Sequence, residues 1–343
     1  IERNLLSYDY HRTPEPMRHV FTDFLFQGLI KLNAIDCYPK IKHFLTYKST
    51  FLTRGVIRTA GALKIKIAIN DIVEHLDDSS FEVREESVQA LMNMNSLLKD
   101  NVIKTYLRNP KSDNFLASII QLLAKLKRVD MKAEIIKYVS VKNRNVRKMV
   151  ALYIGEINAV EQTKLVFNLL LDNDFEVRNE AMNTIINKLS ISNDEKITFV
   201  ESIIEECYKQ EKIQQFTYLV GILTRLGTKN SLPFLINVYK KEPNKTINIE
   251  WKDPEKGTYM QPINIKVSLL DLIKKYNISE IEKDEIEKDI VNQLKTANED
   301  SLGNYINIAS EMKLQSAFPA LIDLLEKEST IWENSIVSAL RQI

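Results

Sequence analysis

Hydrophobic residues recur along this chain at helical spacing, in stretches of 10 to 15 residues separated by short polar segments. Within a stretch, apolar side chains fall at i, i+3 and i+4, the pattern of an amphipathic helix that buries one face. The stretches come in pairs joined by polar residues, so each pair predicts an antiparallel helical hairpin. No apolar window reaches the roughly 18 residues that a membrane-spanning helix needs.

The hairpins repeat with a nearly constant period. Their first-helix anchors at i and i+4 follow one another at 31, 31, 32, 31, 38, 31, 55 and 31 residues. The anchor pairs are Ile41/Leu45, Ile72/Leu76, Ile103/Leu107, Ile135/Val139, Val166/Leu170, Ile204/Tyr208, Leu235/Tyr239, Ile290/Leu294 and Leu321/Leu325. The two long spacings contain insertions. A lone hairpin cannot bury both apolar faces, so neighbouring hairpins are expected to stack into a solenoid.

Several hairpins share a short motif where the second helix begins. It reads Val83-Arg84, Val146-Arg147 and Val177-Arg178, and a proline opens the first helix at Pro39, Pro233 and Pro319. With these residues the chain resembles the HEAT-repeat family. The resemblance implies that the valine packs inward, and that Arg84, Arg147 and Arg178 form a polar ladder with the loop residues Asp172 and Asp174. Thr53, Phe115 and Glu333 stand at the arginine position elsewhere, where we expect the ladder to be interrupted.

The expected fold is therefore all-α: one right-handed α-solenoid of about nine antiparallel helical hairpins over residues 1–343. Residues 1–36 form an N-terminal partial repeat, 37–241 and 265–343 form repeats, and 242–264 form an insertion. The insertion alternates apolar and polar residues on both sides of a Pro-Gly-containing turn, which predicts a β-hairpin. An isolated two-stranded hairpin is marginally stable, so Trp251 and Tyr259 are expected to pack on the solenoid or on a partner.

Composition agrees with helices and adds an asymmetry of charge. The chain has 8 glycines and 9 prolines, below the usual shares of roughly 7% and 5%. Its net charge of +1 conceals 25 basic and 16 acidic residues in 1–150 against 22 and 30 in 151–343. Nine of the basic residues lie between Lys125 and Lys148. Such blocks form solvated faces, or they favour head-to-tail packing and partners with complementary charge.

Motifs for catalysis, metal binding and phosphate binding are lacking. The four histidines have no zinc-ligand spacing, and no Gly-rich phosphate loop is present. Cys37 and Cys207 are expected to be thiols in a reducing compartment. We therefore expect no enzymatic activity, no cofactor and no metal, and a cytoplasmic location. Because the sequence begins at Ile1, a targeting segment upstream stays an open alternative.

The expected function is a noncatalytic protein-protein interaction scaffold within a larger assembly. It would bind through the concave face of the second helices and through the insertion, with Arg54, Arg58, Arg147, Lys148, Trp251 and Tyr259 as candidate contacts. One alternative is nucleic-acid binding by the basic N-terminal half, as in HEAT-like DNA glycosylases. A third reading is a HEAT-like lyase that attaches or detaches a tetrapyrrole. Steep salt dependence of DNA binding would separate the second reading from the first.

Overall fold

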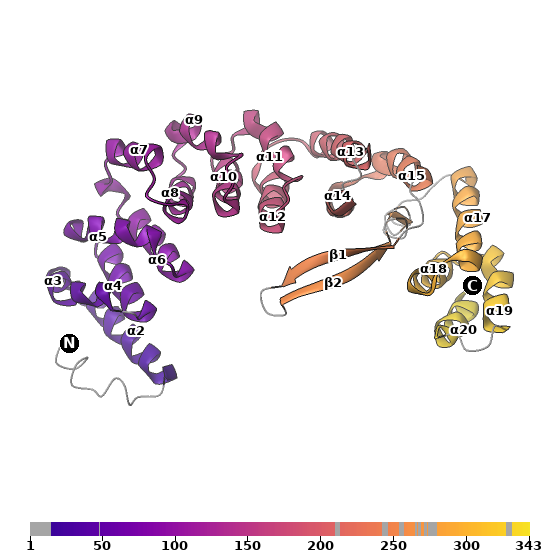
Figure 1. The fold of residues 1–343 in the computed structure, drawn as a ribbon, viewed down its shortest axis with the longest axis horizontal. Helices are drawn as coiled ribbons and strands as arrows, with labels where there is room; N and C mark the ends of the chain where they lie inside the picture. Colours follow the sequence, from indigo (N-terminus) through magenta and orange to yellow (C-terminus); the bar gives the residue numbers. More distant parts are fainter. Residues whose placement is uncertain are drawn as a thin grey trace. The chain divides into compact units, whose positions relative to one another are not determined.

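The computed structural model describes residues 15–47, 49–209, 213–241, 246–253, 257–264, 266, 269–270, 273, 280–326 and 331–343. The chain forms two compact units, Ile1–Ile191 and Ser192–Ile343. Helices predominate in both units, as the helical repeats predict (Figure 1). Among the described residues, no helix has the length and apolar character needed to cross a membrane.

In the first unit, the second helices of successive hairpins pack side by side (Figure 1). Each contacts the next in the order α2, α4, α6, α8, α10 and α12. Their bounds are α2 (Glu15–Lys31), α4 (Thr50–Ala62), α6 (Phe81–Asn93), α8 (Asp113–Lys125), α10 (Arg144–Glu156) and α12 (Phe175–Asn183). A short π-helix, η9 (Thr184–Lys188), continues α12. This row is the common layer against which the first helices pack.

The first helices are composite rather than continuous, which corrects the expectation of 10 to 15 helical residues. Short α-helical segments alternate with 3-10 turns, whose i→i+3 bonds satisfy backbone groups that a short α-helix leaves unpaired at its ends. The segments are η1 (Ile35–Cys37), α3 (Tyr38–Ile41), η2 (Lys42–Thr46), η3 (Lys66–Ala68), α5 (Ile69–Glu74), η4 (His75–Asp77), η5 (Asn95–Leu97), α7 (Asp100–Arg108), η6 (Val129–Met131), α9 (Lys132–Ile135), η7 (Ile136–Tyr138), η8 (Val160–Gln162) and α11 (Thr163–Leu169). The anchors Ile41, Ile72 and Ile135 are nevertheless buried.

A side-chain cap begins each second helix from α4 to α12 at the same register. Ser49, Ser80, Ser112, Asn143 and Asp174 accept a hydrogen bond from the backbone N–H three residues later, which satisfies a donor at the helix start. The residue that donates is buried in all five helices: Leu52, Val83, Phe115, Val146 and Val177. The expected inward packing of the three valines is therefore confirmed.

The caps also correct the register of one repeat. Ser80 and Ser112 are 32 residues apart, whereas the other successive caps are 31 apart. Phe115 therefore occupies the valine position, and Leu116 rather than Phe115 stands at the arginine position.

Four of the turns between hairpins in the first unit reverse direction through a residue in the left-handed region. Asn33, Lys64, Lys127 and Asn158 have φ of 50°, 51°, 51° and 49°. Two backbone hydrogen bonds close each turn in a Schellman motif; at Lys127 they run to Ala124 O (2.9 Å) and from the next N–H to Leu123 O (3.0 Å). Glycine is the usual residue at this position because it lacks Cβ. This glycine-poor chain uses asparagine and lysine instead.

The second unit contains two groups of helices. α13 packs on α14, α17 packs on α18 and α19, and α18 packs on α20. The bounds are α13 (Asn193–Lys209), α14 (Ile213–Leu226), η10 (Lys229–Ser231), α15 (Leu232–Lys241), α17 (Glu280–Thr296), α18 (Glu299–Glu311), η11 (Gln315–Ala317), α19 (Phe318–Glu326) and α20 (Glu333–Gln342). The anchors Leu235, Ile290 and Leu321 are buried in its core.

Two strands lie between α15 and α17. β1 (Thr246–Asp253) pairs antiparallel with β2 (Gly257–Asn264) (Figure 1). Trp251 is opposite Tyr259 and Ile247 is opposite Ile263, so these four positions share one face of the ribbon. The side chains of both strands lie outside what the structure describes.

Candidate interaction surfaces

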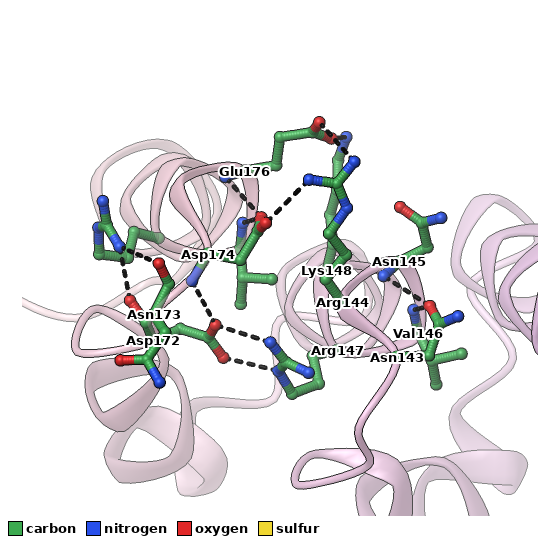
Figure 2. A network of polar contacts seen from close by, with 12 residues as sticks. Asn143, Arg144, Asn145, Val146, Arg147, Lys148, Asp172, Asn173, Asp174 and Glu176 are labelled. Carbon is green, nitrogen blue, oxygen red and sulfur yellow. Dashed lines mark hydrogen bonds and ion pairs between the residues drawn. The ribbon is translucent and has the colours of Figure 1, made fainter. Parts of the chain in front are cut away.

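One arginine of the expected ladder joins two hairpins. The Arg147 guanidinium donates to both carboxylate oxygens of Asp172 in the next hairpin, at 2.7 and 2.8 Å (Figure 2). Its Nη1 also donates to the carbonyls of Val141 and Lys142, at 2.8 and 2.7 Å. The hydrogen bond with Asp172 raises the pKa of Arg147 above its ordinary value. Because the two side chains are only 15% and 9% exposed, this is a largely desolvated bidentate pair.

Arg84 makes the same contacts with its own loop but, within the described residues, no ion pair with the next hairpin. We call such an ion pair between hairpins a rung of the ladder. Its Nη1 donates to the carbonyls of Asp78 (2.6 Å) and Ser79 (3.0 Å). In the following hairpin, the position that matches Asp172 lies two residues before the cap Ser112 and is Pro110, which has no carboxylate. The expected inter-repeat ion pair of Arg84 is therefore corrected: within the described part of the chain, Arg84 closes its own hairpin.

Arg178 lies four residues after the cap of its helix, like Arg84 and Arg147, in the last hairpin of the first unit. Its Nη1 donates to the carbonyls of Asp172 (2.7 Å) and Asn173 (2.9 Å) in its own loop. The contact shared by Arg84, Arg147 and Arg178 is thus the hydrogen bonding of a loop carbonyl pair. The inter-repeat rung is an additional contact of Arg147.

Asp174 has two roles in the same network (Figure 2). Its Oδ1 caps α12 by accepting from the N–H groups of Glu176 (2.9 Å) and Val177 (3.3 Å). Its Oδ2 accepts from Arg144 of the preceding hairpin, at 3.0 Å. Burial would raise the pKa of Asp174, but the hydrogen bond and charge of Arg144 outweigh it, so the pKa lies below its ordinary value.

The cations expected to be available for a partner are engaged between helices. Arg58 bridges Asp23 of α2 (2.6 Å) and Glu86 of α6 (2.8 Å). Arg54 lies 3.6 Å from the same Glu86 carboxylate. Lys148 pairs with Glu176 of α12 at 2.9 Å (Figure 2). The expectation that Arg54, Arg58 and Lys148 are less committed than the ladder arginines is therefore corrected.

The basic segment from Lys125 to Lys148 is neutralised by the hairpins on either side of it. The pairs between hairpins are Lys125–Glu85, Arg128–Asp100, Lys132–Glu161, Arg144–Asp174, Arg147–Asp172 and Lys148–Glu176. The cations are clustered in sequence, but seven of the nine meet a carboxylate in space; within the described residues, Lys127 and Lys142 form no ion pair. A polyanion would have to displace these carboxylates in order to bind here.

Sequence reasoning missed a tyrosine–aspartate contact that occurs in both units. Tyr38 Oη donates to Asp71 at 2.6 Å, and Tyr239 Oη donates to Asp289. Lys42 and Lys266 complete the two clusters, at 3.0 and 2.9 Å from the respective aspartates. Burial, together with the hydrogen bond to aspartate, raises the pKa of both tyrosines. No single spacing marks the contact, because its lysine comes from different places in the two units.

The cysteines and the possibility of a metal site are the remaining candidates for chemistry. Cys37 is half-buried and burial raises the pKa of its thiol, while Cys207 is fully buried. Over the described ranges, no group of three or more His, Cys, Asp or Glu side chains is arranged to hold a metal ion.

Comparison with known proteins identifies no family. No family model matches the chain, and no curated protein matches it. Among solved structures, an engineered protein is similar at 14% identity and a TM-score of 0.37, covering 96% of each chain. Kap121p bound to Nup53p is similar at 11% identity and a TM-score of 0.38, covering 88% of this chain and 38% of that one. Kap121p bound to Pho4p is similar at 10% identity and a TM-score of 0.38, covering 90% of this chain and 39% of that one.

The chain thus spans about two fifths of Kap121p. The structure is that of a helical repeat protein. At these TM-scores, the similarities carry no argument about what this chain binds.

Proposed function

We propose that this chain is a noncatalytic scaffold that binds other proteins, as part of a larger assembly. The supporting observation is a row of stacked hairpins whose neighbours are joined by ion pairs among the second helices and the loops that precede them. Arg58–Glu86 and Arg147–Asp172 are two such pairs. A repeat array held in register in this way offers an extended surface of fixed geometry, which suits recognition of a protein.

Exposed aromatic side chains on the second helices support the same proposal. Phe24 of α2 and Phe81 of α6 are largely exposed. Aromatic residues are enriched in protein interfaces, where they supply contact area at a low cost in conformational entropy. The finer features proposed are HEAT-type hairpins, a right-handed superhelix, a concave face of second helices as the binding face, and a cytoplasmic location.

The insertion is proposed as a second contact region. The register places Trp251 opposite Tyr259 on the same face of the ribbon as Ile247 and Ile263. An apolar face on a two-stranded ribbon needs a surface to cover it, because the ribbon alone is marginally stable. Trp251 and Tyr259 are therefore retained as proposed contacts with a partner.

Nucleic-acid binding is less favoured. Sequence-independent binding of duplex DNA depends on cations that can replace counterions at the phosphates. Most described cations of the second helices and of the basic segment are instead paired with carboxylates, as at Lys148–Glu176 and Arg144–Asp174. No observation favours the tetrapyrrole reading.

The proposal is tested by capture and reconstitution. The intact chain is immobilised, captured proteins are identified and produced, and binding is measured by calorimetry at low and high salt. We expect a defined stoichiometry and an affinity that falls less steeply with salt than that of duplex DNA binding. A random duplex DNA is titrated in parallel. Binding of the DNA alone, with an affinity that falls steeply as salt rises, would contradict the proposal.

A further inference from the structure

The turns that join successive hairpins lie side by side along one edge of the first unit. We call the turns 31–36, 63–67, 95–100, 126–130 and 157–161 the turn edge. Arg128 in the fourth turn pairs with Asp100 in the third, at 2.9 Å. Lys132, just after the fourth turn, pairs with Glu161 in the fifth. These contacts hold consecutive turns next to one another.

Each turn has an aliphatic side chain that is at least partly exposed, and the first turn has a second largely exposed one, Leu32. The five residues follow one another at 32, 31, 31 and 31 positions: Ile35, Ile67, Leu98, Val129 and Val160. Ile35, Ile67, Val129 and Val160 are 50%, 69%, 56% and 38% exposed, and Leu98 is partly buried. A single exposed aliphatic residue is ordinary on a protein surface. Because such a residue recurs in every turn, the five residues form a row along the turn edge.

The turn edge also holds lysines that differ from the cations of the second helices. Five lysines of the turn edge form no ion pair within the described ranges. They are Lys31, Lys64, Lys66, Lys99 and Lys127. Of the carboxylates in these turns, Asp100, Asp130 and Glu161 are held by Arg128 and Lys132, and Asp36 is exposed. The charge available to a partner on this edge is therefore predominantly positive.

We propose that the turn edge is a docking site for an acidic segment of a partner protein that carries regularly spaced aliphatic residues. The proposal rests on the scaffold function above and names the partner's chemistry. Neighbouring helices pack about 8–10 Å apart, and one turn of a polyproline II helix, which has three residues at a rise of about 3.1 Å each, spans about 9 Å and brings every third side chain to the same face. A segment in the polyproline II conformation with an aliphatic residue at every third position matches the row, and its acidic residues would meet Lys64, Lys66, Lys99 and Lys127.

The regular spacing of the aliphatic residues, rather than the charge of this edge, decides between partner classes. An acidic peptide gains from the unpaired lysines and from the aliphatic row together. An anionic membrane surface would also attract lysines and accept aliphatic side chains. The recurrence of an aliphatic residue in every turn favours a linear partner, and binding to vesicles is therefore an outcome that would overturn the proposal.

The probe is a fluorescent 18-residue peptide of six Val-Glu-Glu repeats, with Ser-Glu-Glu and Val-Gln-Gln repeats as matched peptides. Anisotropy with the full chain measures affinity, and vesicles of phosphatidylserine and phosphatidylcholine are tested in parallel. We expect binding of the Val-Glu-Glu peptide, at least about tenfold weaker binding of either matched peptide, and no comparable binding to vesicles.

The charge variant is Lys64→Asn with Lys127→Asn. Asparagine occupies the same left-handed position at Asn33 and Asn158, so the variant is expected to fold normally. It should weaken peptide binding about fivefold and lessen its salt dependence. The matched control is Lys40→Asn with Lys142→Asn, which removes the same charge outside the turn edge and should leave affinity within about twofold.

The aliphatic variant is Ile67→Ser with Val129→Ser and Val160→Ser, for which we expect at least tenfold weaker binding. The proposal is overturned if the Val-Glu-Glu peptide does not bind, if edge and control variants bind it equally, or if vesicles bind more tightly. Capture of a partner by the unmodified chain separates the two proposals. A partner captured equally by the edge variants leaves the scaffold function standing and removes the turn edge, whereas no capture by the unmodified chain contradicts the function itself.

Discussion

Arg147 of one hairpin holds Asp172 of the next through two hydrogen bonds, at 2.7 and 2.8 Å, and at the same time binds two carbonyls of its own loop. Asp172 in turn accepts from the N–H of Asp174, at 2.9 Å. The pair therefore connects the loop of one repeat, the loop of the next and the cap of α12 (Figure 2).

Replacement of Asp172 by Ala should lower the free energy of unfolding by about 2–3 kcal/mol. It leaves the largely buried Arg147 without its carboxylate and the Asp174 N–H without its acceptor. Asp172→Asn, which keeps an acceptor oxygen, should cost less. Urea unfolding measures both, and Lys137→Ala, on the exposed Lys137–Glu134 pair, should change stability by no more than about 0.5 kcal/mol. Equal effects of Asp172→Ala and Lys137→Ala would show that burial of the pair contributes nothing.

The left-handed turn residues predict stabilising substitutions. Lys127 has φ of 51°, where a Cβ is unfavourable. Lys127→Gly should therefore raise the free energy of unfolding by about 0.5–1 kcal/mol, since glycine reaches this region without strain. The same exchange within a helix, Lys104→Gly in α7, should lower it by about 1 kcal/mol. Denaturant midpoints of the two variants should move in opposite directions. Movement in the same direction would mean that the turn conformation does not govern the effect.

The sequence predicted the repeats well because period and burial are local properties. The anchors Ile72 and Ile290 recur with the hairpin, and their apolar side chains must face a neighbour whatever that neighbour is. The partners of the charged residues were not predictable in the same way. Whether Lys148 meets Glu176 depends on where the next hairpin lies, and the sequence of one hairpin does not contain that information.

Small changes of period explain the error in the arginine register. One additional residue between Ser80 and Ser112 moves every later position by one, so counting in steps of 31 reached Phe115 instead of Leu116. The cap residues give the correct register, because a cap is fixed by its hydrogen bond to the helix start. The loss of the rung beside Arg84 follows from Pro110 in the next loop, which a motif search centred on valine and arginine does not inspect.

Val177→Asp should be among the most destabilising single substitutions in the first unit. Val177 is fully buried at the third position of α12, and its replacement would bury a carboxylate among apolar side chains. We expect a loss of about 3–5 kcal/mol. Asn179→Asp adds the same charge at an exposed position of the same helix and should change little. Thermal unfolding of the two variants provides the comparison, and an unchanged melting temperature for Val177→Asp would contradict the described register.

Arg144 should control the acid stability of the α12 cap. The folded pKa of Asp174 lies below its ordinary value of about 3.9, so its carboxylate contributes stability above about pH 4, which is lost as pH falls through the folded pKa. Arg144→Gln removes the opposing charge and leaves burial, which raises the pKa. Stability should then be lost at a higher pH than in the unmodified chain. Carboxyl chemical shifts and unfolding curves between about pH 2.5 and 7 report this change, and Lys142→Gln should leave the profile in place.

Deletion of residues 243–264, bridged by a short Gly-Ser linker, tests whether the insertion contacts a partner or stabilises the fold. The helices on its two sides contact each other directly: Tyr239 of α15 donates to Asp289 of α17, and Lys266 lies 2.9 Å from the same carboxylate and 4.6 Å from the centroid of the Tyr239 ring. Because the deletion keeps all three residues, the melting temperature should stay within about 2 °C if Trp251 and Tyr259 face a partner.

Capture of the partner should then fail. A loss of several degrees would instead mean that the apolar face of the ribbon packs on the helices, since a buried aromatic side chain contributes about 1.5–3 kcal/mol. The double variant Trp251→Ser with Tyr259→Ser, which leaves the chain length unchanged, separates the loss of this face from any strain introduced by the linker. If the double variant keeps both its melting temperature and its partner, neither residue belongs to the binding surface.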